Sequence, residues 1–234
     1  INLINELSKI DTKHKYVLFL RKKYFSSLNL PANWKKVLVD LRHYSLAEQI
    51  KLPGLINREN PDIVHFPHFN APVFYRGKYV VTIHDMLMHK SMGLAATTLP
   101  APLYLFKRLG YRLVFDNAVK QAVKIIVPSQ SVKKELIKTY KISENKVDVT
   151  YEGADTKIIS SGDNFVNKPY FVYAGNAYPH KNLTRLIEAI VSLNKNCNQS
   201  VNLVIASSRG IFTQRLEKII RDQKAGEYVK LLGF

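Results

Sequence analysis

The sequence predicts an α/β protein made of two parallel-sheet domains, and three observations support this prediction. Short apolar runs rich in β-branched and aromatic residues alternate with amphipathic helical runs along nearly the whole chain. The alternation stops in a polar stretch without clear period, residues 156–168, and then resumes. The resumed series has only about three strands, against the five or six usual in a doubly wound sheet. We therefore expect a Rossmann-like domain at 1–158, a linker at 159–168 and a truncated second Rossmann-like domain at 169–234.

The first series opens on a helical pattern in residues 1–10, which begins in mid-pattern, as if its start were missing. Ser45 and Glu48 form a capping box for a later helix, which Pro53 is expected to interrupt. Ser129 is the expected N-cap of a further amphipathic helix. Strands are expected at 16–20, 36–40, 62–66, 79–83, 124–127 and 147–151, with a long helix over 103–120. In the second series, strands are expected at 170–174, 201–206 and 228–232, and helices at 182–194 and 212–224.

Composition limits the class of protein. The 234 residues are 46% hydrophobic, which is typical of a globular chain and excludes disordered and collagen-like classes. Cys197 is the single cysteine, so a disulfide-stapled secreted scaffold is excluded and a reducing, cytoplasmic location is expected. The longest uncharged stretch, residues 91–106, is shorter than the roughly 20 apolar residues of a spanning helix and contains two prolines.

The charge balance is strongly basic, with 35 Lys and Arg against 18 Asp and Glu and a formal net charge of +17. Residues 1–158 carry 25 of these basic residues and 13 of the acidic ones. One interpretation is an ordinary solvated basic surface. The other is an anionic partner, namely a phosphorylated ligand, a membrane surface or a nucleic acid.

The first segment with candidate ligand-binding residues covers 170–190, YFVYAGNAYPHKNLTRLIEAI. An apolar strand ends at Gly175, and Lys181 stands just before Asn182, the expected N-cap of an amphipathic helix. Ligands of open α/β sheets bind at the carboxyl ends of strands, where a helix N-terminus favours negative charge. A lysine beside such a terminus suits a diphosphate; the alternative is a solvated lysine in a loop.

A second polar motif follows the expected strand at 79–83. His84 and Asp85 come where this apolar run ends, so they are expected to face the crevice rather than the core. A histidine there can donate to a sugar hydroxyl or move a proton, and Asp85 can orient it or cap the next segment. The alternative is a structural His–Asp pair. His65 and His68 lack further ligands at workable spacing, so no metal site is expected.

These motifs form an ordered set that resembles a known family. In chain order they are PDIVHF, VVTIHD, VKIIVPSQSVKKEL, KVDVTYEGAD and FVYAGNAYPHKNLTRLIEAI. The set resembles the retaining glycosyltransferases of family 4, the group 1 glycosyltransferases, and most of all their mannosyltransferase-like branch. The resemblance implies a GT-B fold, in which two Rossmann-like domains face each other across a cleft. The acceptor then binds mainly the first domain and the nucleotide-sugar donor mainly the second.

The resemblance also implies roles for particular residues. Lys181 matches the lysine that contacts the donor diphosphate, and Gly175 matches the glycine that lets the backbone approach the donor. Asn176 follows Gly175 in this donor-binding loop, and an arginine that often accompanies the lysine is absent. His84, with Asp85 beside it, matches the active-site histidine near the transferred sugar. Neither a cofactor nor a catalytic metal is expected. The chain begins with Ile rather than Met, and two family motifs are expected beyond its ends, so it is interpreted as a fragment that is inactive alone.

The activity implied is transfer of a hexosyl residue, mannosyl in the nearest branch, with retention. The acceptor would be a saccharide or lipid-linked saccharide in cell-surface polysaccharide assembly. One alternative is a non-transferring GT-B relative such as a sugar-nucleotide epimerase. A nucleic-acid-binding module is disfavoured, because most aromatic residues fall in apolar strands or helix faces and no binding motif is present. The basic first domain and the uncharged residues 91–106 further suggest peripheral attachment to the anionic inner face of the cell membrane.

Overall fold

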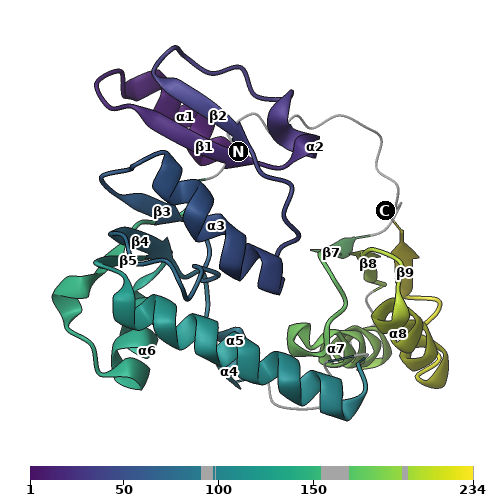
Figure 1. Cartoon of the computed structure of the whole chain (residues 1–234). Helices are drawn as coiled ribbons and strands as arrows, with labels where there is room; N and C mark the ends of the chain where they lie inside the picture. Colours follow the sequence, from purple (N-terminus) through teal and green to yellow (C-terminus); the bar gives the residue numbers. More distant parts are fainter. Residues whose placement is uncertain (91–96, 98, 154–168, 197–199, 234) are drawn as a thin grey trace. The chain divides into compact units, whose positions relative to one another are not determined.

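The structure is a computed structural model that describes residues 1–90, 97, 99–153, 169–196 and 200–233 (Figure 1). The chain divides into two compact units, one made of Ile1–Met86 with Leu105–Glu152 and the other of Leu87–Tyr104 with Gly153–Phe234. The linker expected at 159–168 lies outside the described residues. The domain boundaries drawn from the sequence therefore stay a prediction.

The first unit is built on parallel strands. In the described residues β1 pairs with β2, and β3, β4, β5 and β6 form another sheet in that order, with every pairing parallel. The α/β class with parallel sheets is therefore confirmed. The elements are α1 (Asn2–Ile10), β1 (Tyr16–Leu20), α2 (Lys22–Phe25), β2 (Trp34–Leu38), α3 (Leu46–Arg58), β3 (Val64–Phe66), β4 (Tyr79–Thr82), α4 (Leu87–Lys90), α5 (Ala101–Gln121), β5 (Lys124–Val127), α6 (Gln130–Tyr140), η2 (Glu144–Lys146) and β6 (Val147–Val149). Of these, α4 and the first turn of α5 belong to the second unit.

The core of the first unit explains why its strands are apolar. Val81 of β4 and Ile125 and Val127 of β5 are fully buried. They share one cluster with Phe115 of α5 and Leu136 of α6. Parallel strands that helices cover in this way appear in the sequence as near-continuous apolar runs, so they could be predicted from it.

Two helix predictions for this unit have different outcomes. Ser45 caps α3, since its Oγ accepts a hydrogen bond from the N–H of Glu48 at 3.1 Å. The interruption at Pro53 is wrong, because α3 continues through it to Arg58. An interior proline removes one backbone hydrogen bond and costs about 3 kcal/mol. Here Pro53 is buried, and Ile56 on the next turn is packed in the core cluster, so burial offsets that cost.

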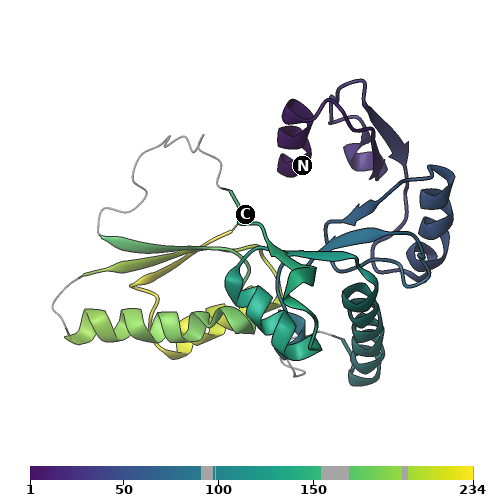
Figure 2. The same ribbon diagram turned by 90° about the vertical axis from the view of Figure 1, so that its left-hand side faces the viewer.

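The second unit contains the parallel strands β7, β8 and β9, in that order, in the described residues. Two helices, α7 and α8, lie along one face of this sheet (Figure 2). Their buried residues, such as Ile187 and Leu216, form a single cluster with Leu203 and Ile205 of β8. The elements are β7 (Tyr170–Ala174), η3 (Pro179–Lys181), α7 (Leu183–Asn196), β8 (Asn202–Ala206), α8 (Ile211–Asp222) and β9 (Val229–Leu232).

None of the helices that the structure describes combines the length and apolarity needed to cross a bilayer.

Candidate functional site

The candidate residues of the first unit follow the carboxyl ends of parallel strands. His84 and Asp85 come just after β4, His68 just after β3, and Glu152 shortly after β6. Because β3, β4, β5 and β6 are parallel, these strand ends share one edge of the sheet. Ligands of open α/β sheets bind at that edge.

The four residues after β4 alternate between buried and exposed positions in the order buried, exposed, exposed, buried. Ile83 and Met86 are buried in the core, at 0% and 3% exposure, whereas His84 and Asp85 between them are exposed. Because the buried side chains of Ile83 and Met86 flank His84 and Asp85, they hold this polar pair at the edge of the sheet. His84 therefore remains accessible to a ligand while its backbone is fixed.

Two groups orient the His84 imidazole. Nε2 lies 3.1 Å from the carbonyl oxygen of Pro67. A carbonyl only accepts, so Nε2 is the donor in this contact. Nδ1 lies 3.5 Å from Oε1 of Glu152, an ion pair whenever the ring is protonated. Pro67 thus faces Nε2 and Glu152 faces Nδ1. The orienting role expected for Asp85 therefore stays a prediction.

Glu152 and Pro67 are functional candidates that the sequence argument missed. Glu152 lies in the motif KVDVTYEGAD, which carried no site residue in the sequence-based prediction. A signal was nevertheless present, because Glu152 follows a short strand of a parallel sheet, as His84 does. The contact of Pro67 uses its backbone oxygen, so no side-chain pattern could have indicated it.

His68 lies next to His84 on the same edge. The two ring centroids are 6.2 Å apart, and His68 packs against Phe69 at 4.2 Å. Burial of the His68 ring lowers its pKa, and the nearby charge of His84 acts in the same direction. A neutral His68 offers one donor and one acceptor, which suits the hydroxyl groups of a sugar.

Among the described residues, no group of three or more His, Cys, Asp or Glu side chains is arranged to hold a metal ion. His65, weighed as a ligand together with His68, instead places Nε2 2.8 Å from Oγ1 of Thr82 on the neighbouring strand.

In the second unit, Gly175 directly follows β7 and adopts a conformation that favours glycine. Its φ is +146°, and a Cβ at this position would lie 3.1 Å from the Tyr173 hydroxyl oxygen. That hydroxyl donates to the backbone oxygen of Asn176 at 2.8 Å, which closes the turn. The N–H of Gly175 donates to Ala206 of β8 at 3.0 Å, so the loop leaves directly from the sheet edge.

Lys181 stands at the end of η3, directly before Asn182 and α7. Its side chain is exposed, and its ammonium group has no ion pair or hydrogen bond with any residue in the described part of the chain. The N-cap predicted for Asn182 is wrong, because its φ of 53° and ψ of 38° are left-handed, whereas an N-cap is extended. Lys181 is thus an available cation beside the first turn of α7.

A small hollow of about 310 Å³ lies farther along the same sheet edge, at the ends of β8 and β9 and the start of α8. Ser207 is 2% exposed there, and its Oγ has no hydrogen-bond partner in the described part of the chain. None of the sequence motifs indicated this site, although Ser207, Ser208 and Arg209 follow an apolar strand. The lining residues are Ser207, Arg209, Gly210, Thr213, Gln214, Glu217, Leu231, Leu232 and Gly233.

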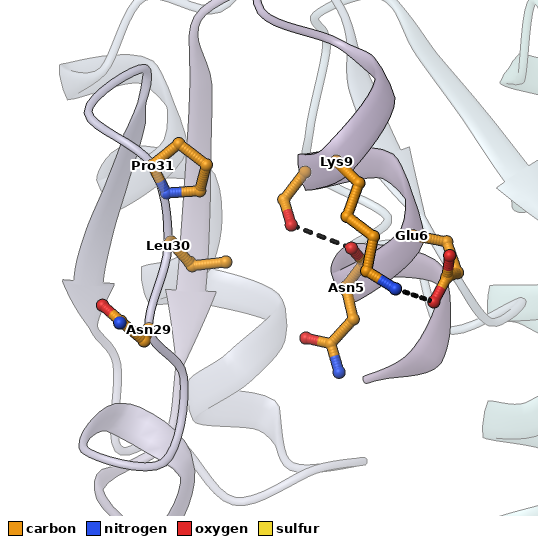
Figure 3. A pocket seen from close by; sticks show the side chains of 7 residues that line it. Asn5, Glu6, Lys9, Asn29, Leu30 and Pro31 are labelled. Atoms are coloured by element: carbon orange, nitrogen blue, oxygen red, sulfur yellow. Dashed lines mark hydrogen bonds and ion pairs between the residues drawn. The ribbon is translucent and has the colours of Figure 1, made fainter.

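A hollow of about 570 Å³ in the first unit lies between α1 and residues 29–31 (Figure 3). Its two charged residues, Glu6 and Lys9, pair with each other at 2.6 Å. None of the predicted site residues lines it, so we assign it no part in the chemistry.

Comparison with known proteins identifies the family. Residues 14–158 match the family described as Glycosyltransferase Family 4, and residues 154–234 match Glycosyl transferases group 1. The chain belongs to glycosyltransferase family 4. The resemblance found in the sequence motifs is therefore confirmed.

One curated relative of this family 4 chain is the O-antigen chain mannosyltransferase RfbU of Salmonella typhimurium. It is 23% identical over 214 residues, which are 87% of this chain and 53% of the relative. The chain thus spans about half the length of the curated relative that it matches.

Solved structures support the GT-B fold of the family 4 chain. The apo form of the lipopolysaccharide outer core galactosyltransferase WaaB matches with a TM-score of 0.61 and 14% identity, over 100% of this chain and 62% of WaaB. WaaG, a glycosyltransferase involved in lipopolysaccharide biosynthesis, matches with a TM-score of 0.58 and 10% identity, over 93% of this chain and 70% of WaaG. Likeness at such identity concerns the fold alone.

Proposed function

We propose that the full-length protein is a retaining glycosyltransferase that takes a hexosyl residue from a nucleotide-sugar. The hexosyl residue that we favour is mannosyl. The acceptor is a saccharide or lipid-linked saccharide in cell-surface polysaccharide assembly. The observation that carries the proposal is the presence of both family matches in one chain, each with polar residues at the carboxyl ends of its strands. The relative RfbU supports the mannosyl donor and the O-antigen type of product.

In the proposed reaction the second unit holds the donor. Lys181 and the first turn of α7 offset the charge that builds on the leaving diphosphate. Gly175 and Asn176 bring backbone close to the donor, since Gly175 has no side chain to stand in the way. These groups supply positive charge from the protein itself, and we propose that no metal or cofactor takes part.

The proposed role of the first unit is to hold the acceptor and to place His84 at the transferred sugar. Nε2 of His84 would stay on the Pro67 carbonyl, while a protonated Nδ1 would exchange its contact with Glu152 for a hydrogen bond to the donor sugar that orients the anomeric carbon. Asp85 adds a carboxylate beside His84. His84 does not act as a nucleophile in this scheme.

The test uses the full-length protein with a panel of nucleotide-sugars and with saccharide and lipid-linked acceptors. We expect transfer from one nucleotide-hexose, with NMR showing the same anomeric configuration in donor and product. Conversion of the donor sugar without an acceptor would instead identify a sugar-nucleotide epimerase. An inverted product would contradict the retaining mechanism.

We also propose that the protein binds an anionic membrane surface from the cytoplasmic side. Residues 91–96 and 98 of the uncharged stretch lie outside the described residues, but its last six residues, 101–106, form the start of α5. One side of α5 exposes large apolar side chains, and the exposed Arg112 lies next to them on the helix. An exposed apolar face with basic residues is typical of helices that lie on anionic bilayers. The apolar residues are Leu105 (63% exposed), Phe106 (75%), Leu109 (58%) and Leu113 (60%).

Vesicle sedimentation tests this surface. We expect the protein to pellet with anionic vesicles, less with neutral ones, and less again as salt screens the charges. The double variant F106S/L109S should reduce pelleting several-fold, because it removes apolar area that would enter the bilayer. The control is Ile10→Ser, an apolar residue on α1 that is 80% exposed and therefore at least as exposed as Phe106 and Leu109. Equal recovery with neutral and anionic vesicles would contradict the proposal.

A further inference from the structure

Tyr44 is an aromatic residue in a conformation that aromatic residues rarely adopt. It lies in the loop after β2 with φ of 59°, in the left-handed region. Its side chain is not placed there by burial, because the residue is 63% exposed. Strained backbone persists where the surroundings hold it, and such residues gather at ligand-binding sites.

A buried carboxylate holds the Tyr44 backbone. Oε2 of Glu48, in the first turn of α3, accepts from the N–H of Tyr44 at 2.8 Å and from Nδ2 of Asn70 at 2.7 Å. Glu48 is 7% exposed, so these contacts are shielded from water. Ser45 completes the loop, as its Oγ donates to the carbonyl of Arg42 at 2.7 Å. The loop after β2 is thereby attached to the segment after β3.

The held ring of Tyr44 lies beside the candidate catalytic edge. Its hydroxyl is 3.4 Å from Nδ1 of His68, and the two rings meet edge to face with centroids 6.1 Å apart. His68 in turn lies 6.2 Å from His84, between centroids. A row of Tyr44, His68 and His84 therefore runs along the strand ends of the first unit.

This row has the chemistry of a sugar-binding surface. A pyranose ring has an apolar face of C–H groups and a rim of hydroxyl groups. An exposed aromatic ring suits that face, and histidine nitrogens suit the rim. We propose that Tyr44 and His68 bind the sugar ring of the acceptor that receives the transferred residue, and so present its hydroxyl beside His84. This inference rests on the proposed function, because it assigns the acceptor to the same edge.

The experiment measures steady-state kinetics of the full-length protein with a saccharide acceptor. Tyr44→Gly removes the ring and also relieves the positive φ, so the variant should fold at least as well as the wild type. We expect its acceptor KM to rise roughly tenfold, as loss of a stacked aromatic contact predicts, while its donor KM stays unchanged. Tyr44→Phe keeps the stacking ring and should remain within about threefold of the wild-type acceptor KM.

Tyr24→Ala is the matched control, since Tyr24 is a partly exposed tyrosine on α2, 41% exposed, and should leave both KM values unchanged. An unchanged acceptor KM in Tyr44→Gly, or a parallel rise in donor KM, would overturn the inference. The inference would also be overturned by a defect seen with a lipid-linked acceptor but not with the free saccharide, because Tyr44 would then contact the lipid.

Absence of transfer in the wild type would instead overturn the proposed function. Calorimetric titration with the saccharide alone then reports on the acceptor site directly: weaker binding to Tyr44→Gly than to the wild type keeps a saccharide site, and equal binding excludes it.

Discussion

Replacement of His84 by alanine in the full-length protein is expected to lower turnover by about 10²–10³-fold, the usual cost of losing one preorganised transition-state hydrogen bond. Affinity for the nucleoside diphosphate should stay nearly unchanged, because the proposed diphosphate contacts belong to the second unit. Single-turnover kinetics and calorimetric titration with the nucleoside diphosphate separate the two effects.

The control for this variant is His14→Ala. His14 is another exposed histidine, 2.7 Å from the carboxylate of Asp11, and should leave turnover unchanged. A clear fall in the melting temperature of His84→Ala would show that His84 is structural. Full turnover in a folded variant would contradict the role assigned to it.

Replacement of Lys181 by alanine is expected to weaken binding of the nucleoside diphosphate by roughly tenfold or more, since a charge-assisted contact contributes about 1.5–3 kcal/mol. Folding should be unaffected, because Lys181 is exposed and its side chain makes no hydrogen bond or ion pair with the described residues. Isothermal titration calorimetry on the full-length protein measures the loss.

Lys195→Ala provides the matched comparison for Lys181, because it removes an exposed lysine from the last turn of the same helix, α7. A cation at that end of the helix lies far from the first-turn N–H groups and should not contribute to diphosphate binding. Equal affinity in Lys181→Ala and the wild type would favour the solvated-loop alternative.

Apolar pattern was sufficient to predict most elements of the fold. The bounds expected for β1, β5 and β7 agree with the structure, because each is a short apolar run in a parallel sheet. The strand expected at 36–40 instead lies at Trp34–Leu38, where Trp34 stacks on Tyr16 of β1 at 4.0 Å. Pro53 was misjudged for a related reason, since contacts with distant parts of the chain override local propensity.

The candidate site was only partly predictable. His84 was found because a polar pair follows an apolar strand, which is a local signal. The contacts that orient it come from Pro67 and Glu152, which precede and follow it by many residues. Tyr44 gave no sequence signal at all, since its positive φ depends on a hydrogen bond to Glu48. Contacts between residues far apart in the chain depend on the order of the strands in the sheet. The periodicity of apolar residues in the sequence does not reveal that order.

The position of the candidate residues at strand ends bears on how acceptor preference can change in evolution. The core beneath them rests mainly on strand and helix residues such as Val81, Ile125 and Val127, so loops can be replaced while the sheet persists, provided that Ala71 of the loop after β3, which is part of that core, is kept. Glu48 sets a condition on such replacement, because it ties the loop after β2 to the segment after β3. A chimaera that transplants the acceptor loops of a relative should therefore carry residues 39–49 and 67–73 together. Acceptor specificity would then be inherited as a two-segment module rather than residue by residue.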